Sequence, residues 1–151
     1  MGYIDWLRTA KTKQITPHFT LYDIGFSQTA VTYGFDNTPT PLIIKNATLL
    51  YQKVLEPLRN HYNCAVSVHC TYRCPQVNAK IGSKSTSQHI VGQAVDFNVV
   101  GHSIEEVYQY IKNNMVFDQL IQEGTWIHVS YKATGNRKQC LRMINGKYVN
   151  G

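Results

Sequence analysis

One segment of the sequence contains residue types that together can bind a metal ion. Residues 87–96 (SQHIVGQAVD) place His89 and Asp96 on the two sides of a predicted loop-to-strand junction, where Gly92 lets the backbone bend. A second histidine, His128, lies in the later strand-like sequence WIHVS. Two imidazoles and one carboxylate can bind Zn²⁺ and leave its fourth position to water, which is typical of catalytic zinc sites. We therefore expect these three residues to bind one zinc ion per chain.

Alternation of apolar and β-branched residues predicts the strands that position these ligands. The pattern covers residues 65–70, 94–100, 117–123 and 126–131. The last two segments are joined by Gly124-Thr125, and glycine at the first central position fits a type II′ hairpin turn. Asn145-Gly146 predicts another tight hairpin near the end of the sequence. Residues 73–88 are expected to be mostly loop, with a short helix near 76–80.

Two helices are predicted to flank this sheet. Thr40 as cap and Pro41 at the first helical position begin a helix that runs to about Asn60. Its apolar residues recur at spacings near three and four and predict one core-facing stripe: Leu42, Ile43, Ala47, Leu50, Val54 and Leu58. A capping box at residues 103–106 begins a helix that ends near residue 113. Separate runs of helices and strands indicate an α+β fold with a small antiparallel sheet flanked by helices.

Length and composition restrict the class of protein. The 151 residues fit a single domain, which we assign to residues 16–151 after a polar lead-in at residues 1–15. A hydrophobic fraction of 43% excludes a disordered chain. The net charge of +6 favours polyanionic partners such as an anionic cell wall. The lysines and arginines are scattered, so no specific nucleic-acid partner is expected.

Targeting signals and cysteine spacing restrict the setting in which the protein works. The first residues contain no apolar run of secretory length, so we expect synthesis in the cytoplasm without a signal peptide. No segment approaches the ~18 apolar residues of a membrane span, and no membrane partner is expected. The four cysteines include no C-x-x-C pair, which favours free thiols.

Three motifs resemble the M15 family of zinc peptidases, which contains D-Ala-D-Ala carboxypeptidases and L-alanyl-D-glutamate endopeptidases of bacteria and phages. Residues 87–96 match S-x-H-x-x-G-x-A-x-D, and residues 126–130 match W-[IV]-H-V-S. Residues 72–78 (YRCPQVN) are similar to the family sequence Y-R-S-P-x-x-N. The resemblance spans roughly residues 16–140 and points to the phage-like, single-domain branch of the carboxypeptidase subgroup. It implies a fold like that of hedgehog domains and DD-peptidases, with zinc bound by His89, Asp96 and His128.

The resemblance also implies residues that contact the substrate. It places Arg73 in the active site, where a guanidinium suits a substrate carboxylate or a developing oxyanion. Ser87 is a candidate to hydrogen-bond the peptide, and capping of its own loop is an equal alternative. Ordinary structural interpretations are favoured for the remaining histidines and for the two cysteines near Arg73: packing for His18 and His69, surface positions for His61 and His102, and small buried thiols for Cys70 and Cys74.

The general base is the point at which the sequence departs from the endopeptidase members of the family. Those members place glutamate three residues before the last histidine ligand, but that position here is threonine, in the Gly124-Thr125 turn. A two-residue turn there pairs Ile121 with His128. Because side chains alternate along strands, Glu123 then shares the face of His128, whereas Asp118 faces away. Glu123 is therefore the predicted general base.

The resemblance implies a zinc metallopeptidase that hydrolyses peptidoglycan stem peptides, as a D-Ala-D-Ala carboxypeptidase or a related endopeptidase. We expect a monomeric phage or prophage cell-wall hydrolase, which acts on the anionic wall after release from the cell or as part of a virion. Two alternatives remain: a catalytically silent zinc domain that binds the cell wall or a partner, and a basic nucleic-acid-binding protein with a structural metal. The sequence leaves open whether D-Ala-D-Ala, L-Ala-D-Glu or a cross-link is cleaved.

Overall fold

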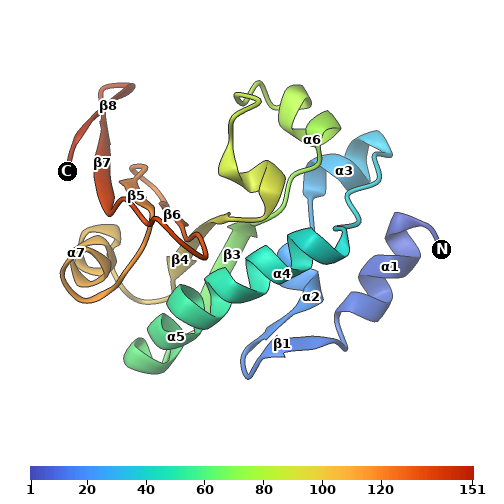
Figure 1. Ribbon diagram of the computed structural model, residues 1–151, viewed down its shortest axis with the longest axis horizontal. Coiled ribbons are helices and arrows are strands. Elements are labelled where there is room, and N and C mark those ends of the chain that lie inside the picture. Colours follow the sequence, from blue (N-terminus) through green and yellow to red (C-terminus); the bar gives the residue numbers. More distant parts are fainter.

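Six strands form one sheet in the order β3-β4-β6-β5-β7-β8 in the computed structural model, which describes all 151 residues (Figure 1). The strands are β3 (Val66–Cys70), β4 (Ala94–Val99), β5 (Gln119–Gln122), β6 (Ile127–Ser130), β7 (Gln139–Ile144) and β8 (Lys147–Asn150). The α+β class is confirmed, but the sheet is mixed rather than wholly antiparallel, because β5 and β7 run parallel. After β6 the chain crosses β5, and β7 begins beside the start of β5, where the backbone N–H of Gln139 donates to the carbonyl of Asp118 at 2.9 Å.

Helices surround the sheet and a separate pair of short strands. The short strands are β1 (Gln14–Thr16) and β2 (Phe19–Thr20). The α-helices are α1 (Tyr3–Ala10), α2 (Leu21–Gly25), α3 (Gln28–Tyr33), α4 (Pro41–Leu50), α5 (Glu56–Tyr62), α6 (Pro75–Lys80) and α7 (Ile104–Asn114). A π-helical turn, η1 (Tyr51–Leu55), joins α4 to α5, and a 3-10 helix, η2 (Gln88–Val91), precedes β4. None of the helices is both long and apolar enough to span a membrane.

The first residues form a packed helix, which the expectation of a polar lead-in did not include. Tyr3, Leu7 and Ala10 of α1 are buried, at helical spacings of four and three. The Tyr3 hydroxyl donates to the carbonyl of Gly25 at 2.7 Å and accepts from the backbone N–H of Ser27 at 2.9 Å. The helix therefore belongs to the same hydrophobic core as the rest of the chain.

The predicted helix from Thr40 is confirmed, with one irregular turn. The Thr40 hydroxyl accepts from the backbone N–H of Ile43 at 3.3 Å. The helix continues through η1 into α5, and the π turn precedes Pro57, whose ring lacks an N–H and crowds the carbonyl four residues earlier. The predicted apolar stripe is buried except for Leu42, which is 64% exposed.

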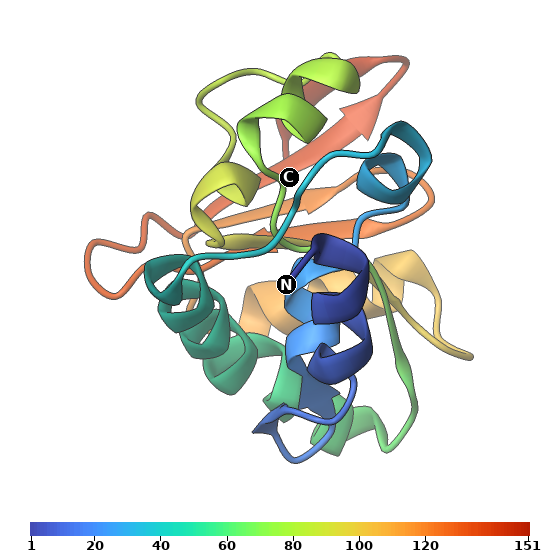
Figure 2. The same ribbon diagram turned by 90° about the vertical axis from the view of Figure 1, so that its right-hand side faces the viewer.

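The two faces of the sheet have different roles. Val95, Phe97 and Val99 of β4 belong to the hydrophobic core, whereas Asp96 between them faces the other way. Figure 2 shows the long helix α4–α5 and α7 on one side of the sheet and α6 on the other. The face that carries Asp96 is thus left open to a cleft.

Both predicted hairpins are present. In the first, Ile121 pairs with His128 as predicted, and Gly124 has a φ of 94°. In the second, Asn145 and Gly146 have φ values of 51° and 75° between β7 and β8, as a type I′ turn requires. The turn residues therefore fix which side chains of these strands face the cleft.

Candidate metal centre

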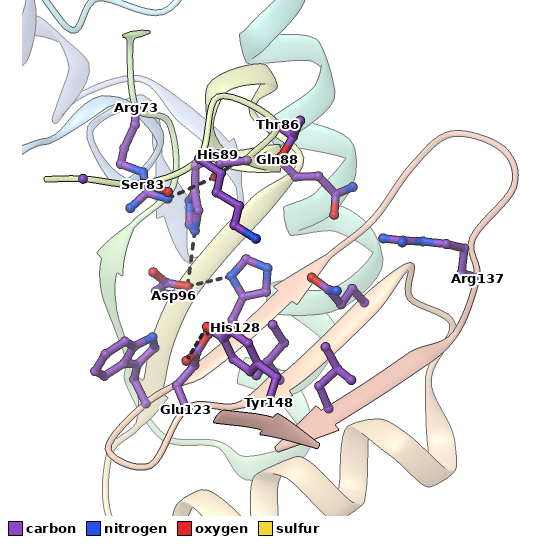
Figure 3. A pocket seen from close by; sticks show the side chains of 17 residues that line it. Arg73, Ser83, Thr86, Gln88, His89, Asp96, Glu123, His128, Arg137 and Tyr148 are labelled. Atoms are coloured by element: carbon purple, nitrogen blue, oxygen red, sulfur yellow. Dashed lines mark hydrogen bonds and ion pairs between the residues drawn. The ribbon is translucent and has the colours of Figure 1, made fainter. Parts of the chain in front are cut away.

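The three predicted ligands lie together in one cleft (Figure 3). Asp96 Oδ1 is 3.3 Å from His89 Nε2 and 2.9 Å from His128 Nδ1, and all three ligand atoms lie within 4.8 Å of one another. Tetrahedral zinc, with bonds of ~2.0–2.2 Å, separates its ligand atoms by about 3.4 Å. The spacing of the three residues therefore fits a single ion. Adjacent strands produce this spacing, because Asp96 on β4 and His128 on β6 are paired residues.

The hydrogen bonds of His89 show that a cation suits this site. Its Nδ1 lies 2.7 Å from the Thr71 carbonyl, which can only accept, so Nδ1 carries the proton and Nε2 presents a lone pair. That lone pair points at the Asp96 carboxylate, which is also an acceptor. The side chain of His89 is only 2% exposed, and burial lowers its pKa, which disfavours the imidazolium that would relieve the contact. A metal ion between the two acceptors satisfies both.

The electrostatics of Asp96 also fit a ligand. Burial raises the pKa of this carboxyl, but the two facing histidines outweigh burial and hold the pKa well below its usual range. Asp96 is therefore an anion at neutral pH, as zinc coordination requires.

Gly92 positions His89 by allowing a close approach between η2 and α4. Its φ is +73°, and a Cβ at this position would lie 2.8 Å from the carbonyl oxygen of Ile43. The side-chain amide of Asn46 in α4 donates to the Val91 carbonyl at 2.9 Å, which holds the same contact. The glycine of the motif is thus needed for packing as well as for bending.

Arg73 and Ser87 lie in the cleft and contact each other. Arg73 Nη2 donates to Ser87 Oγ at 3.1 Å, and the backbone N–H of Arg73 donates to the His89 carbonyl at 3.1 Å. Ser87 Oγ also accepts from the backbone N–H of His89 at 3.3 Å, which supports the loop-capping interpretation. Ser87 thus links the guanidinium to the ligand loop, while contact of either residue with substrate stays a prediction.

Asn37 supports this region, and the sequence analysis did not identify it. It is fully buried, and its amide donates to the carbonyls of Gly25 and Tyr72 at 3.0 and 3.1 Å. Its Oδ1 accepts from the backbone N–H of Cys74 at 2.7 Å. These bonds hold the residues on both sides of Arg73. The only sequence signal was an asparagine in a proline-containing loop, a position that favours hydrogen bonds from the side chain to the backbone.

Glu123 lines the same cleft as the three ligands, on the face that the predicted hairpin gives it. Burial raises the pKa of its carboxyl, the opposing effect of His128 being smaller. The hydroxyl of Tyr148 lies 3.2 Å from both carboxylate oxygens and donates to them. Tyr148 comes from β8, and the sequence analysis did not place it at the site.

Asp118, the other nearby acid, does not line the cleft. Its carboxylate is fully buried and accepts from Arg137 Nε at 3.0 Å and from Nη2 at 2.8 Å. Gln88 Nε2 also donates to it at 3.0 Å. Asp118 therefore fixes the loop after β6 and the segment beside His89.

The remaining histidines and cysteines stay outside the group of ligands. His18 is paired with Glu56 at 2.6 Å, as local packing predicts. His69, expected to be partly buried, is exposed and contacts Asn98, because this face of β3 is not covered. Cys74 is buried as predicted, whereas Cys70 is only partly buried; the surroundings of its thiol nevertheless raise the thiol pKa to about 12.

The cleft is large enough for a peptide, and its lining carries both positive and negative charges. Its volume is about 690 Å³, and its basic lining residues are Arg73, Lys84 and Arg137. Asp96 and Glu123 are the acidic lining residues. A substrate that carries carboxylates at a distance from the reacting bond would find complementary charge here.

Comparison with known families identifies the chain. The family model described as peptidase M15 matches residues 17–130. The chain belongs to the peptidase M15 family. The matched segment of this M15 peptidase contains Arg73, Glu123 and all three candidate ligands, but it ends before β7. No curated protein matches the chain significantly.

Proposed function

We propose that this M15 peptidase is zinc-dependent and hydrolyses the stem peptides of peptidoglycan. The observation that carries the proposal is the buried lone pair of His89 Nε2, which faces Asp96 and lies close to His128 in a peptide-sized cleft. Zinc bound by these residues would polarise the scissile carbonyl and lower the pKa of a bound water toward ~7.

Glu123 would act as general base and then as general acid. Its carboxylate would take a proton from the attacking water and later deliver that proton to the leaving amine. Burial raises the pKa of this carboxyl and brings it closer to the working pH, where proton transfer in both directions is efficient. Asp118 is the nearest other acid in the sequence, and its bonds to Arg137 leave it no such role.

Arg73 would bind a carboxylate of the substrate or the oxyanion that develops at the scissile carbonyl. Its contact with Ser87 restrains the guanidinium before the substrate arrives, so less side-chain entropy is lost on binding. Ser87 would then act by orienting Arg73 as well as by direct hydrogen bonding to the peptide.

The cellular role that we propose is cell-wall hydrolysis by a phage or prophage enzyme. The resemblance of the motifs to the phage-like branch supports this role, and a net charge of +6 favours retention on an anionic wall. Electrostatic retention of this kind weakens as ionic strength rises. We propose that the enzyme acts as a monomer, since one chain contributes every residue of the site.

Mass spectrometry of muropeptides tests the proposal directly. Purified walls of several chemotypes would be digested by the protein with zinc, and in parallel with a chelator present. Loss of a terminal alanine would identify a carboxypeptidase, and cleavage between L-Ala and D-Glu an endopeptidase. Absence of any zinc-dependent change on every wall type would refute the peptidoglycan substrate.

The variant Glu123→Gln tests the general base separately from the metal. We expect turnover to fall by about 10²–10⁴-fold, because general acid–base catalysis contributes this much, while zinc content stays unchanged. Glu106→Gln is the matched control, since it makes the same chemical change in α7, away from the cleft. A fully active Glu123→Gln protein would exclude the assigned role.

A further inference from the structure

The candidate site extends into strands that follow the segment matched by the family model. Arg137, Leu141 and Tyr148 line the cleft, and all of them come after residue 130. Tyr148 is the one that touches a residue with a proposed chemical role, through the hydrogen bonds to both oxygens of Glu123. Figure 3 shows the two side chains meeting below His128.

The register of the sheet explains why Tyr148 reaches Glu123. Ile121 pairs with His128 on one side and with Leu141 on the other, and paired residues point to the same face. Glu123 follows the last residue of β5 and, two residues after Ile121, shares its face. On β7, Met143 lies two residues after Leu141 and pairs with Tyr148. Glu123 and Tyr148 are thus two strands apart, about 9.5 Å between backbones, and only a long side chain on β8 can span the gap.

The C-terminal hairpin that presents Tyr148 is fixed on the opposite face. Arg142 has the other parity and forms a two-bond ion pair with Glu105 of α7, at 2.6 and 2.7 Å. Its guanidinium also lies over the ring of Tyr108, 4.4 Å from the centroid. Lys112 Nζ donates to the Gly151 carbonyl at 3.1 Å. These contacts to α7 hold the hairpin in place without using the side chain of Tyr148.

We infer that Tyr148 is a positioning residue for Glu123, and that the hairpin β7–β8 is therefore a functional part of the site. The phenol donates to the carboxylate and restrains its direction, so that a basic oxygen faces the reacting atoms. This inference rests on the proposed role of Glu123 as general base. Tyr148 is 53% exposed and does not belong to the hydrophobic core, so a role in packing does not account for it.

Kinetics of Tyr148→Phe test the inference. We expect kcat to fall about tenfold with KM unchanged, because a hydrogen bond to a charged group is lost and the aromatic ring is kept. Tyr33→Phe is the matched control, since Tyr33 is 55% exposed and lies outside the cleft. In a Glu123→Asp background the shorter carboxylate no longer meets the phenol, and adding Tyr148→Phe should cause no further loss. Unchanged kcat in Tyr148→Phe would overturn the inference.

A second measurement needs neither metal nor activity. In metal-free protein labelled with ¹³C at the tyrosine Cζ, the Tyr148 resonance is assigned by its absence in Tyr148→Phe. Burial and the Glu123 carboxylate raise the pKa of this phenol, so Glu123→Gln should let it titrate at lower pH. An identical titration in both proteins would overturn the contact itself. A shifted titration combined with a fully active Glu123→Gln enzyme would instead overturn the general-base role, and with it the inferred function of Tyr148.

Discussion

Replacing Gly92 with alanine separates two reasons for a glycine near the candidate ligand His89: a positive φ and a close contact with α4. The residue has a φ of +73°, where a side chain costs about 1–2 kcal/mol. The added Cβ would also lie 2.8 Å from the carbonyl oxygen of Ile43 and 2.9 Å from its Cγ2. Backbone cannot move aside as a flexible side chain can, so η2 or α4 must shift, at the ~1–3 kcal/mol typical of overpacking. We expect Gly92→Ala to lower the free energy of unfolding by about 2–5 kcal/mol in total.

Gly34→Ala is a close control for the conformational part of this loss. Gly34 also has a φ of +73°, but no atom lies within 4 Å of a Cβ built there. Gly34→Ala should lower the free energy of unfolding by only about 1–2 kcal/mol, which for a chain of this length is a fall in Tm of roughly 2–8 °C. Thermal and urea denaturation of the metal-free proteins measures both losses.

The excess loss in Gly92→Ala should be accompanied by weaker zinc binding. A shift of η2 moves His89 relative to Asp96, and such displacements of a ligand's support reduce metal affinity by about 10–100-fold. Gly34→Ala should bind zinc normally, because α3 carries no ligand. Equal destabilisation of the two variants, or an unchanged zinc affinity in Gly92→Ala, would refute the close-contact argument.

Two further predictions concern pH and the metal. Burial raises the pKa of Asp118, but the bonds from Arg137 outweigh it and hold the pKa well below its usual range. The contribution of this carboxylate to stability is therefore complete above about pH 5, and it is lost as the pH falls through the unfolded-state pKa toward the folded-state pKa. Asp118→Asn should lower the free energy of unfolding by about 1–2 kcal/mol at pH 7, as measured by urea denaturation. The difference in stability between the two proteins should narrow between pH 5 and 2, and a constant difference would contradict the ion pair between Asp118 and Arg137. Zinc at 100 times its Kd should stabilise the fold by about 2.7 kcal/mol, whereas magnesium, or zinc added to His89→Ala, should not; a Tm increase in either control would contradict the site.

The grouping of the three candidate metal ligands could be predicted from residue types and motifs in the sequence, and local rules explain the face on which they lie. Alternation along β4 and β6 fixes the face of each residue, and the Gly124-Thr125 turn fixes the register between Ile121 and His128. A one-residue slip would have turned Glu123 away from the ligands. The predicted orientation of Glu123 therefore depended on the turn residues and on the alternation of side chains along a strand, both of which are visible in a single sequence.

The features that escaped prediction depend on contacts between distant parts of the chain. The buried residues Tyr3, Leu7 and Ala10 of α1 have helical spacing, but their burial depends on packing against later parts of the chain. The parallel pairing of β5 with β7 depends on where the loop after β6 crosses the sheet, and no local pattern specifies that crossing. Asn37 acts on backbone groups 12 to 37 residues away, as its hydrogen bonds show.

The position and the pKa of Glu123 depend both on local rules and on contacts between distant parts of the chain. The local hairpin rule aims its carboxylate into the cleft, but burial and three neighbouring groups shift its pKa: burial and the Asp96 charge raise the pKa, while His128 and Tyr148 lower it. His128 is at the site because of a local turn, whereas Tyr148 is there because β7 runs parallel to β5 and the Asn145-Gly146 turn returns the chain along β7. The chemistry of the proposed base is therefore determined by the topology of the whole sheet, including the two strands beyond the family match.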